Sequence, residues 1–243
     1  MSELFEIWVY LAERPLVWLT VTVLVYWAAH RLYLQCNELA LLNPVLIAVV
    51  ALVGILVVTD TEYGTYFEGA QFVHFLLGPA TVALAVPLYG QAHRLRRMGL
   101  PLAVALIAGS VTAVVSALGI GWLLGLEPDV LRSLMPKSVT TPVAMGISEK
   151  VGGLPSLTAV LVILTGITGA VLAMPLLHLL GYGPEDATAK GFALGVSAHG
   201  IGTARAFQHS EEAGAFAGLG MGLNALLTAL LVPLINALVM LAW

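Results

Sequence analysis

Charged side chains are scarce in this sequence. Asp, Glu, Lys and Arg make up 10% of its 243 residues, whereas a soluble globular domain carries about 25%. Hydrophobic residues make up 59% of the chain. A soluble protein of this size needs a charged surface, and these charges are too few to form one. The composition therefore excludes an ordinary soluble domain and indicates an integral membrane protein.

The few charges are also unevenly spaced. Five stretches contain no Asp, Glu, Lys or Arg and together cover more than half of the chain; they are 39–59, 69–92, 98–126, 151–184 and 213–243. An apolar run of about 18 or more residues is typical of a membrane-spanning helix. Because the runs are continuously apolar rather than alternating, they disfavour a membrane β-barrel. The sequence predicts an all-α, polytopic membrane protein forming a single integral membrane domain over residues 1–243.

Other absences narrow the function. Cys36 is the one cysteine, which excludes an internal disulfide framework and a thiolate metal cluster. The chain has a net charge of −4 and only a short basic cluster, so nucleic acid is not an expected partner. No nucleotide-binding or metalloprotease motif is present. We therefore expect no enzymatic activity, cofactor or metal site. The acidic N-terminus lacks the basic start of a signal peptide, so we expect direct insertion into the membrane.

About seven to eight transmembrane segments are expected. The first covers roughly 15–34, and the second begins at Asn43-Pro44, where proline suits a first helical turn. Lys and Arg near the ends of spans place the basic loop 90–100 in the cytoplasm and the acidic loops, including 185–186, on the other side. Segment 134–148 is too short to span comfortably. It either crosses or is re-entrant, and a re-entrant course would change the side of every later segment.

An internal repeat is a further hypothesis. GPATVALAVP at 78–87 and MPKSVTTPVA at 135–144 share a proline and two valines at the same spacing. Each is followed by Gly-Leu-Pro and a long apolar span, which suggests repeat units at about 72–126 and 134–182. Transporters built from repeats have such proline-broken helices at their binding sites. The relative orientation of the two units stays open.

Three segments place polar groups at membrane depth, where they are costly and usually serve function. The first is PKSVTTP, in which two prolines flank Lys137, Ser138, Thr140 and Thr141. Proline removes a backbone donor and breaks a helix, and a broken helix offers a positive end to an anion. The alternative is structural: the hydroxyls bond to carbonyls of their own helix, and Lys137 extends to the interface.

The second segment is FALGVSAHGIGTARAF, which contains His199, Gly202, Thr203 and Arg205. Its glycines permit an unwound or closely packed backbone. A forked guanidinium suits a carboxylate, so Arg205 is a candidate ligand. The alternative is a glycine face for helix packing, with Arg205 at a cytoplasmic helix end. The third segment is GPATVALAVP, in which Pro79 and Thr81 are candidates. Asn224 in the last span is a further candidate, either for ligand binding or for a hydrogen bond to a neighbouring helix.

The motifs also carry a family resemblance. PKSVTTPVAMGISEKVGGLPSLTAVLVILTGITGAV, GFALGVSAHGIGTARAF and GLGMGLNALLTALLVPLI resemble the LrgB/CidB family of membrane proteins. NPVLIAVV and FLLGPATVALAVPLY resemble its amino-terminal half, so the resemblance covers about residues 40–240. Gly146 departs from the family pattern, which has an acidic residue there. The resemblance carries Lys137, Ser138, Thr140, Thr141, His199, Gly202, Thr203 and Arg205 over as matched motif positions.

The resemblance implies two functions of different classes. The family is described as antiholin-like, modulating murein hydrolase activity and autolysis. It also extends to the plant plastidial glycolate/glycerate translocator and to bacterial members linked with pyruvate uptake. Broken helices and buried cations favour a carrier, so we expect a transporter of small monocarboxylates in the bacterial inner membrane. The alternative is a holin/antiholin-like modulator of autolysis. A small LrgA/CidA-type membrane protein, a second copy of the chain, or both are the expected protein partners.

Overall fold

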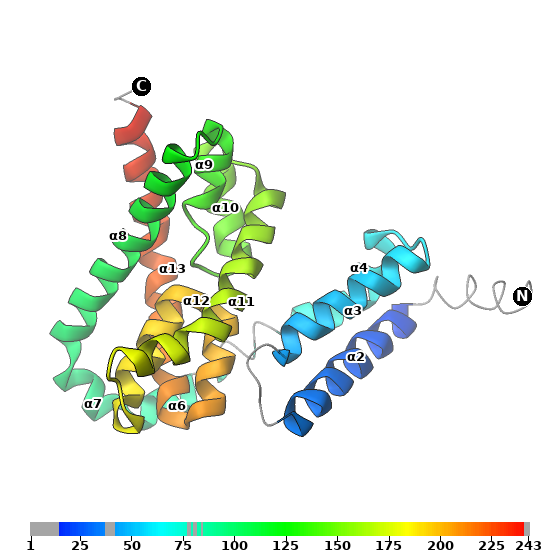
Figure 1. Ribbon diagram of the computed structural model, residues 1–243, viewed down its shortest axis with the longest axis horizontal. Coiled ribbons are helices and arrows are strands. Elements are labelled where there is room, and N and C mark those ends of the chain that lie inside the picture. The colour runs from blue at the N-terminus through cyan, green and yellow to red at the C-terminus, as the bar shows by residue number, and fades with distance from the viewer. Residues whose placement is uncertain (1–14, 37–41, 77–78, 80–81, 84, 241–243) are drawn as a thin grey trace, which may run out of the picture. The chain divides into compact units, whose positions relative to one another are not determined.

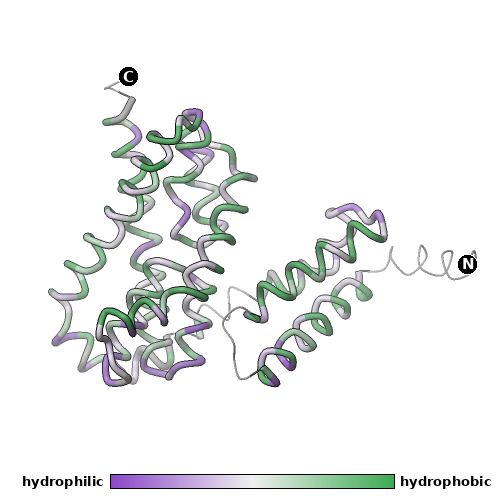
Figure 2. The backbone as a smooth tube through the Cα atoms, in the orientation of Figure 1, coloured by the Kyte–Doolittle hydropathy of each residue, from purple (hydrophilic) through white to green (hydrophobic). Residues whose placement is uncertain are grey.

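The structure is a computed structural model that describes residues 15–36, 42–76, 79, 82–83 and 85–240 (Figure 1). Helices account for nearly all of this described part, and it contains no strand. The predicted all-α class is therefore confirmed. The chain divides into two compact units, Met1–Ala83 and Leu84–Trp243, which are described separately below. Hydrophobic residues run along the long helices, and the hydrophilic ones gather at helix ends and turns (Figure 2).

The described residues of the first unit form the helices α2 (Pro15–Gln35), α3 (Pro44–Val58) and α4 (Tyr63–Phe75). The Asn43 side chain caps α3 by accepting a hydrogen bond from the Val45 N–H at 2.9 Å. With proline at the first helical position, this cap fixes the start of α3. The predicted start of the second apolar segment at Asn43-Pro44 is thus confirmed.

Close packing holds α4 against α2. A Cβ on Gly69 would lie 2.8 Å from the Trp18 Cβ, so only glycine allows this approach. The rings of Trp18 and Tyr66 meet edge to face with their centroids 5.7 Å apart. Thr22 donates a hydrogen bond to the Tyr66 hydroxyl at 3.2 Å. The first unit is therefore a small helical bundle with α2 at its centre.

In the second unit, α6 (Ala85–Gly90) and α7 (Ala92–Arg97) precede three long helices: α8 (Gly99–Leu123), α11 (Pro155–Leu179) and α13 (Glu211–Met240). Twenty-five residues rise about 38 Å as a helix, which exceeds the hydrocarbon core of about 30 Å. Together with α2, these make four described helices that are long and apolar enough to cross a membrane. The predicted count of seven to eight spans is not confirmed.

The segment between α8 and α11 enters and leaves the second unit at the same end. It comprises α9 (Pro128–Leu134), a non-helical stretch over 135–140 and α10 (Thr141–Val151). The end of α9 lies beside the residue that precedes α11, because the Leu154 N–H donates to the Ser133 Oγ at 2.7 Å. Segment 134–148 therefore does not cross the unit. It follows the re-entrant course, as part of a hairpin. Its tip lies at 136–140.

A second hairpin is formed within α12 (Ala187–His209), where Ala198 and His199 have non-helical backbone angles. A Cβ on Gly202 would lie 2.6 Å from the Leu194 carbonyl oxygen. Eight residues of straight helix span about 12 Å, so the chain must fold back at the break. Ala206, Leu194 and Ala187 accordingly share one buried cluster with alanines of α13. The second hairpin has its tip at 197–200.

The two hairpins enter the second unit from opposite ends. The first lies where α8 ends, since Gly121 packs against Leu131. The second lies where α8 begins, since Met98 and Thr188 line one pocket together with Tyr182. Loop 180–186 therefore lies at the same end as 92–98. The prediction that placed 185–186 opposite loop 90–100 is wrong, because it counted 134–148 as a crossing.

Candidate functional site

A buried asparagine connects the two hairpin tips. The Asn224 Nδ2 donates hydrogen bonds to the Val196 carbonyl of α12 at 2.9 Å and to the Ser138 carbonyl of the first tip at 3.3 Å. Its Oδ1 accepts hydrogen bonds from the Ser110 hydroxyl of α8 at 2.6 Å and from the Thr228 hydroxyl at 3.2 Å. We call these five residues the polar centre. It joins α8, α12, α13 and the tip of the first hairpin.

The polar centre lies deep in the second unit. The side chains of Ser110, Ser138, Asn224 and Thr228 are each at most 1% exposed. Ser110 is near the middle of α8, and Asn224 is near the middle of α13. In a bilayer this depth corresponds to the hydrocarbon interior, where an unpaired polar group is costly. The hydrogen bonds of Asn224 satisfy these groups and hold both tips at that depth.

The tip of the first hairpin is an interrupted helix, as the two prolines predicted. The chain leaves helical geometry after Leu134 and resumes it at Thr141, with Thr140 in an extended conformation as the N-cap. The Thr140 side chain makes no capping hydrogen bond, so the first amides of α10 are not capped by that hydroxyl. Ser138 is buried, whereas Lys137, Thr140 and Thr141 are half-buried. The tip thus combines a positive helix end with a lysine and three hydroxyls.

The second tip is held in place by His199, which is 5% exposed. Its ring Nε2 lies 2.9 Å from the Val162 carbonyl oxygen of α11. Its φ of +42° is unusual for a side chain of this size. Thr203 donates a hydrogen bond to the His199 carbonyl at 2.8 Å. A Cβ on Gly166 would lie 2.7 Å from the imidazole Cε1, so glycine at this position of α11 makes room for the ring.

The remaining residues that the sequence predicted as substrate ligands do not lie together in the structure. Gly202 packs the two limbs of the second hairpin together, which favours a structural role. Arg205 lies six residues beyond His199, about 9 Å along the helix, and its Nη1 donates to the Gln208 Oε1 at 2.9 Å. Neither Gly202 nor Arg205 takes part in the hydrogen bonds of the polar centre described for Asn224. Pro79 is exposed and belongs to the first unit, and Thr81 lies outside the described residues.

Sequence reasoning missed several buried polar residues, three of which are notable for their position. Ser110 and Thr228 belong to the polar centre, and Lys190 in the first half of α12 is 6% exposed. Lys190 could have been found as an isolated charge in a glycine-rich apolar segment. Ser110 could not, because α8 also carries the exposed Ser116 and sequence alone does not say which face is buried.

Taken together, the two tips present the same kind of structure at the same depth. In each, a half-helix begins at the tip: α10 at Thr141, and the second half of α12 after His199. The amino-terminal end of a helix carries a partial positive charge and free amide donors, which favour an anion. No group of three or more His, Cys, Asp or Glu side chains within the described part could hold a metal ion. The geometry suits a small anion better than a metal.

Long apolar helices, two re-entrant hairpins and a polar centre at mid-depth define a polytopic α-helical membrane protein. Comparison with known proteins identifies the family within this class. Residues 22–238 match the profile of the LrgB-like family, and the chain belongs to this family. The resemblance drawn from the motifs is thereby confirmed.

Several relatives match along nearly their whole length. "Uncharacterized protein YwbG" of Bacillus subtilis (strain 168) is 37% identical over 218 residues, which cover 90% of this chain and 96% of the relative. "Holin-like protein CidB" of Staphylococcus epidermidis is 29% identical, with 91% and 96% covered. "Antiholin-like protein LrgB" of Bacillus cereus is 29% identical, with 90% and 95% covered. No solved structure matches the chain significantly.

Proposed function

We propose that this protein transports small monocarboxylates, of the glycolate, glycerate or pyruvate kind, across the bacterial cell membrane. The observation that carries the proposal is the meeting of two oppositely directed hairpin tips at Asn224. Each tip brings a half-helix amino terminus to the middle of the unit. Discontinuous helices that direct such ends at an anionic group are the hallmark of carrier binding sites.

The charge distribution supports an anion as the substrate. Lys137 lies on the first tip, and Arg205 follows the second tip within the same hairpin. The only other charges among residues 128–210 of the second unit lie toward helix ends or on Lys190. In this proposal the carboxylate binds between the tips, with Ser138, Thr140 and Thr141 as hydroxyl donors. Entry from either end requires only that one hairpin move relative to the other.

Transport is tested with the purified full-length chain in proteoliposomes. We expect saturable uptake of labelled glycolate, pyruvate or lactate, with no release of a trapped fluorescent dye from the same vesicles. Asn224→Leu should lower uptake strongly, because it disconnects both tips. Thr168→Val is the matched control, since Thr168 is an exposed residue whose hydroxyl bonds to its own helix at 2.7 Å. Absence of uptake of all three acids would contradict the proposal.

A holin- or antiholin-like role is the second candidate, and the relatives favour it more directly than transport. Two of them are named "Holin-like protein CidB" and "Antiholin-like protein LrgB". In this case the chain would modulate murein hydrolase activity and autolysis by forming or blocking membrane lesions. Such lesions need self-association rather than an anion site. Dye release that rises steeply with protein density, without saturable acid uptake, would support this second role.

Assembly with other membrane proteins is also proposed. The exposed apolar helices can pack against a small LrgA/CidA-type membrane protein or against a second copy of the chain. We expect co-purification of such a protein from bacterial membranes in mild detergent. A strictly monomeric particle at all protein densities, with no bound partner, would contradict this part of the proposal.

A further inference from the structure

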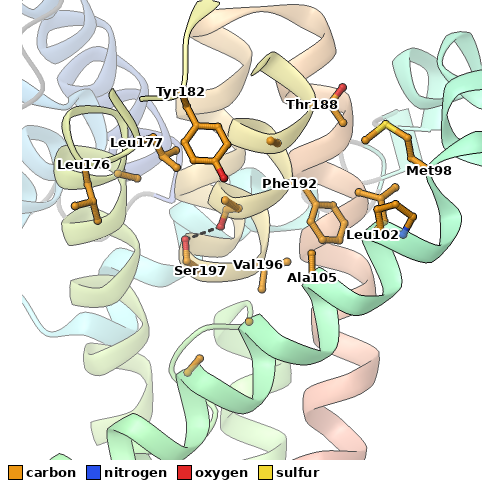
Figure 3. Close-up of a pocket in the computed structure, with 16 residues that line it drawn as sticks. Met98, Leu102, Ala105, Leu176, Leu177, Tyr182, Thr188, Phe192, Val196 and Ser197 are labelled. Atoms are coloured by element: carbon orange, nitrogen blue, oxygen red, sulfur yellow. Dashed lines mark hydrogen bonds between the residues drawn. The ribbon is translucent and has the colours of Figure 1, made fainter. Parts of the chain in front are cut away.

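A large apolar pocket lies beside the second hairpin, and Val196, whose carbonyl belongs to the polar centre, borders its deep end. It has a volume of about 520 Å³ and is lined by α8, the end of α11, the loop at Tyr182 and the first half of α12 (Figure 3). This volume falls within the range of about 300–1,000 Å³ that is typical of small-molecule sites. Nothing in the proposed transport of a small anion uses it.

The pocket is long and runs from one end of α8 to its middle. On α8 its lining begins at Met98 and finishes at Ala113. Fifteen residues of helix rise about 22 Å. Half of a bilayer that is about 40–45 Å thick with its headgroup regions measures about 20–22 Å. The pocket therefore has the length of a single lipid leaflet, from the headgroup region to the bilayer centre.

Its polarity changes along the same direction. Tyr182, Thr188 and Met98 lie toward one end of the pocket, and Val196 lies farther in (Figure 3). On α8 the lining continues from Met98 to Gly109 and Ala113, which form the deep end. Ser197 also lines the pocket, but its hydroxyl is satisfied by the Ala193 carbonyl at 2.7 Å. No residue of the lining is charged. A carboxylate would lose its hydration here without a partner, and an apolar cavity offers water almost no hydrogen bonds.

The surface around the pocket is apolar as well. Leu100, Val104 and Leu176 are exposed by 77%, 59% and 54%, and they lie on the two candidate spans that border the opening. In a membrane such a surface meets lipid chains. The exposed Arg96 and Arg97 directly precede Met98 at the outer end, where lipid headgroups lie.

We propose that this pocket binds one acyl chain of a membrane phospholipid, with the headgroup beside Tyr182 and Thr188 and the chain end near Val196. The bound chain fills the space between α8 and the first half of α12. It thereby supports the second hairpin from the side opposite to α13, whose backbone packs against Gly191 and Gly195 of α12.

The test uses the full-length protein in phosphatidylcholine liposomes that contain a trace of a phospholipid with a photoreactive diazirine near one chain end. After irradiation, cross-linked peptides are mapped by mass spectrometry. We expect cross-links at 109–113 and 196–197 that saturate as the mole fraction of the probe rises. Lipid that only surrounds the protein would instead label all exposed apolar faces in proportion to the mole fraction of the probe.

Two exposed alanines of α8 provide a matched pair of variants. Ala105 lines the pocket, whereas Ala108 does not. Ala105→Trp should reduce cross-links at 109–113 and 196–197 at least fivefold, and Ala108→Trp should leave them unchanged. Ala193→Trp fills the pocket from the α12 side and should act like Ala105→Trp, which guards against misfolding of one variant. Unsaturable labelling in the wild type, or equal labelling in all of these variants, would overturn the proposal.

Discussion

The Asn224 side chain on α13 donates a hydrogen bond to the Val196 backbone carbonyl on α12, with Nδ2 and oxygen 2.9 Å apart. The same amide reaches the Ser138 carbonyl at the tip of the first hairpin. One buried side chain thus connects two segments that enter the unit from opposite ends. The relative position of the hairpins depends on this connection.

Asn224→Leu should therefore destabilise the protein. The substitution keeps the approximate volume but leaves Ser110, Thr228 and two carbonyls without their partner. An unsatisfied buried polar group costs about 1–3 kcal/mol, which corresponds to a fall in melting temperature of roughly 2–12 °C. Thermal unfolding in detergent measures this, with Thr168→Val as the control of little effect. Equal melting temperatures for Asn224→Leu and wild type would show that the polar centre contributes nothing to stability.

The packing of α11 on the second hairpin gives a second prediction. A Cβ on Gly169 would lie 2.5 Å from the Ala198 Cβ, whereas one on Gly119 of α8 would meet nothing within 4 Å. Gly169→Ala should lower the melting temperature because it pushes α11 away from the break at Ala198. Gly119→Ala should be neutral or stabilising by up to about 1 kcal/mol. The two variants should thus differ in sign when compared by thermal unfolding, and a similar response in both would contradict this packing.

The re-entrant course of both hairpins is tested by labelling with an impermeant thiol reagent in a background lacking Cys36. Cysteines replacing Glu127 and Lys150, which lie near the two ends of the first hairpin, should be accessible from the same side. Cysteines replacing Glu185 and His209, at the ends of the second, should share the opposite side together with one replacing His93. Opposite labelling of Glu127→Cys and Lys150→Cys would show that 128–151 crosses the membrane.

Arg205 remains a predicted carboxylate ligand. Replacing it with lysine keeps the charge but removes the forked donor geometry. We expect stabilisation of the protein by added glycolate or pyruvate to fall strongly in Arg205→Lys and to vanish in Arg205→Ala. Thermal unfolding with and without the acid measures this. If both variants are stabilised like the wild type, Arg205 is not part of the binding site.

Some of this architecture was predictable because it depends on local sequence. The charge-free runs revealed a helical membrane protein, and Pro136 and Pro142 marked the interruption at 135–140. The break in α12 was not predictable in the same way, since it falls at Ala198 and His199, which are neither glycine nor proline. It depends on Gly166 and Gly169 in α11, some thirty residues earlier, which make room for His199 and Ala198. Such tertiary contacts leave no local signal.

The predicted number of spans shows a second limit. Residues 190–207 are apolar and long enough to suggest a crossing, yet the chain turns back halfway. Length and hydropathy are the same for a spanning helix and for two half-helices in a hairpin. Tertiary contacts, such as those of Gly202 with Leu194 and Ala198, distinguish the two courses. Ser110 was not predicted as a member of the polar centre because its bond to Asn224 is also a tertiary contact, which forms only once both tips are in place.

The central claim, that a small carboxylate binds between the two hairpin tips, is tested most directly by substrate protection of a single cysteine at Thr140. In a background lacking Cys36, the rate at which a small hydrophilic thiol reagent modifies Thr140→Cys is measured against increasing glycolate or pyruvate. We predict that the rate falls, with half of the effect at the acid concentration that gives half-maximal uptake, while Glu127→Cys reacts at a constant rate. A Thr140→Cys rate that stays unchanged at concentrations that saturate uptake would contradict the claim.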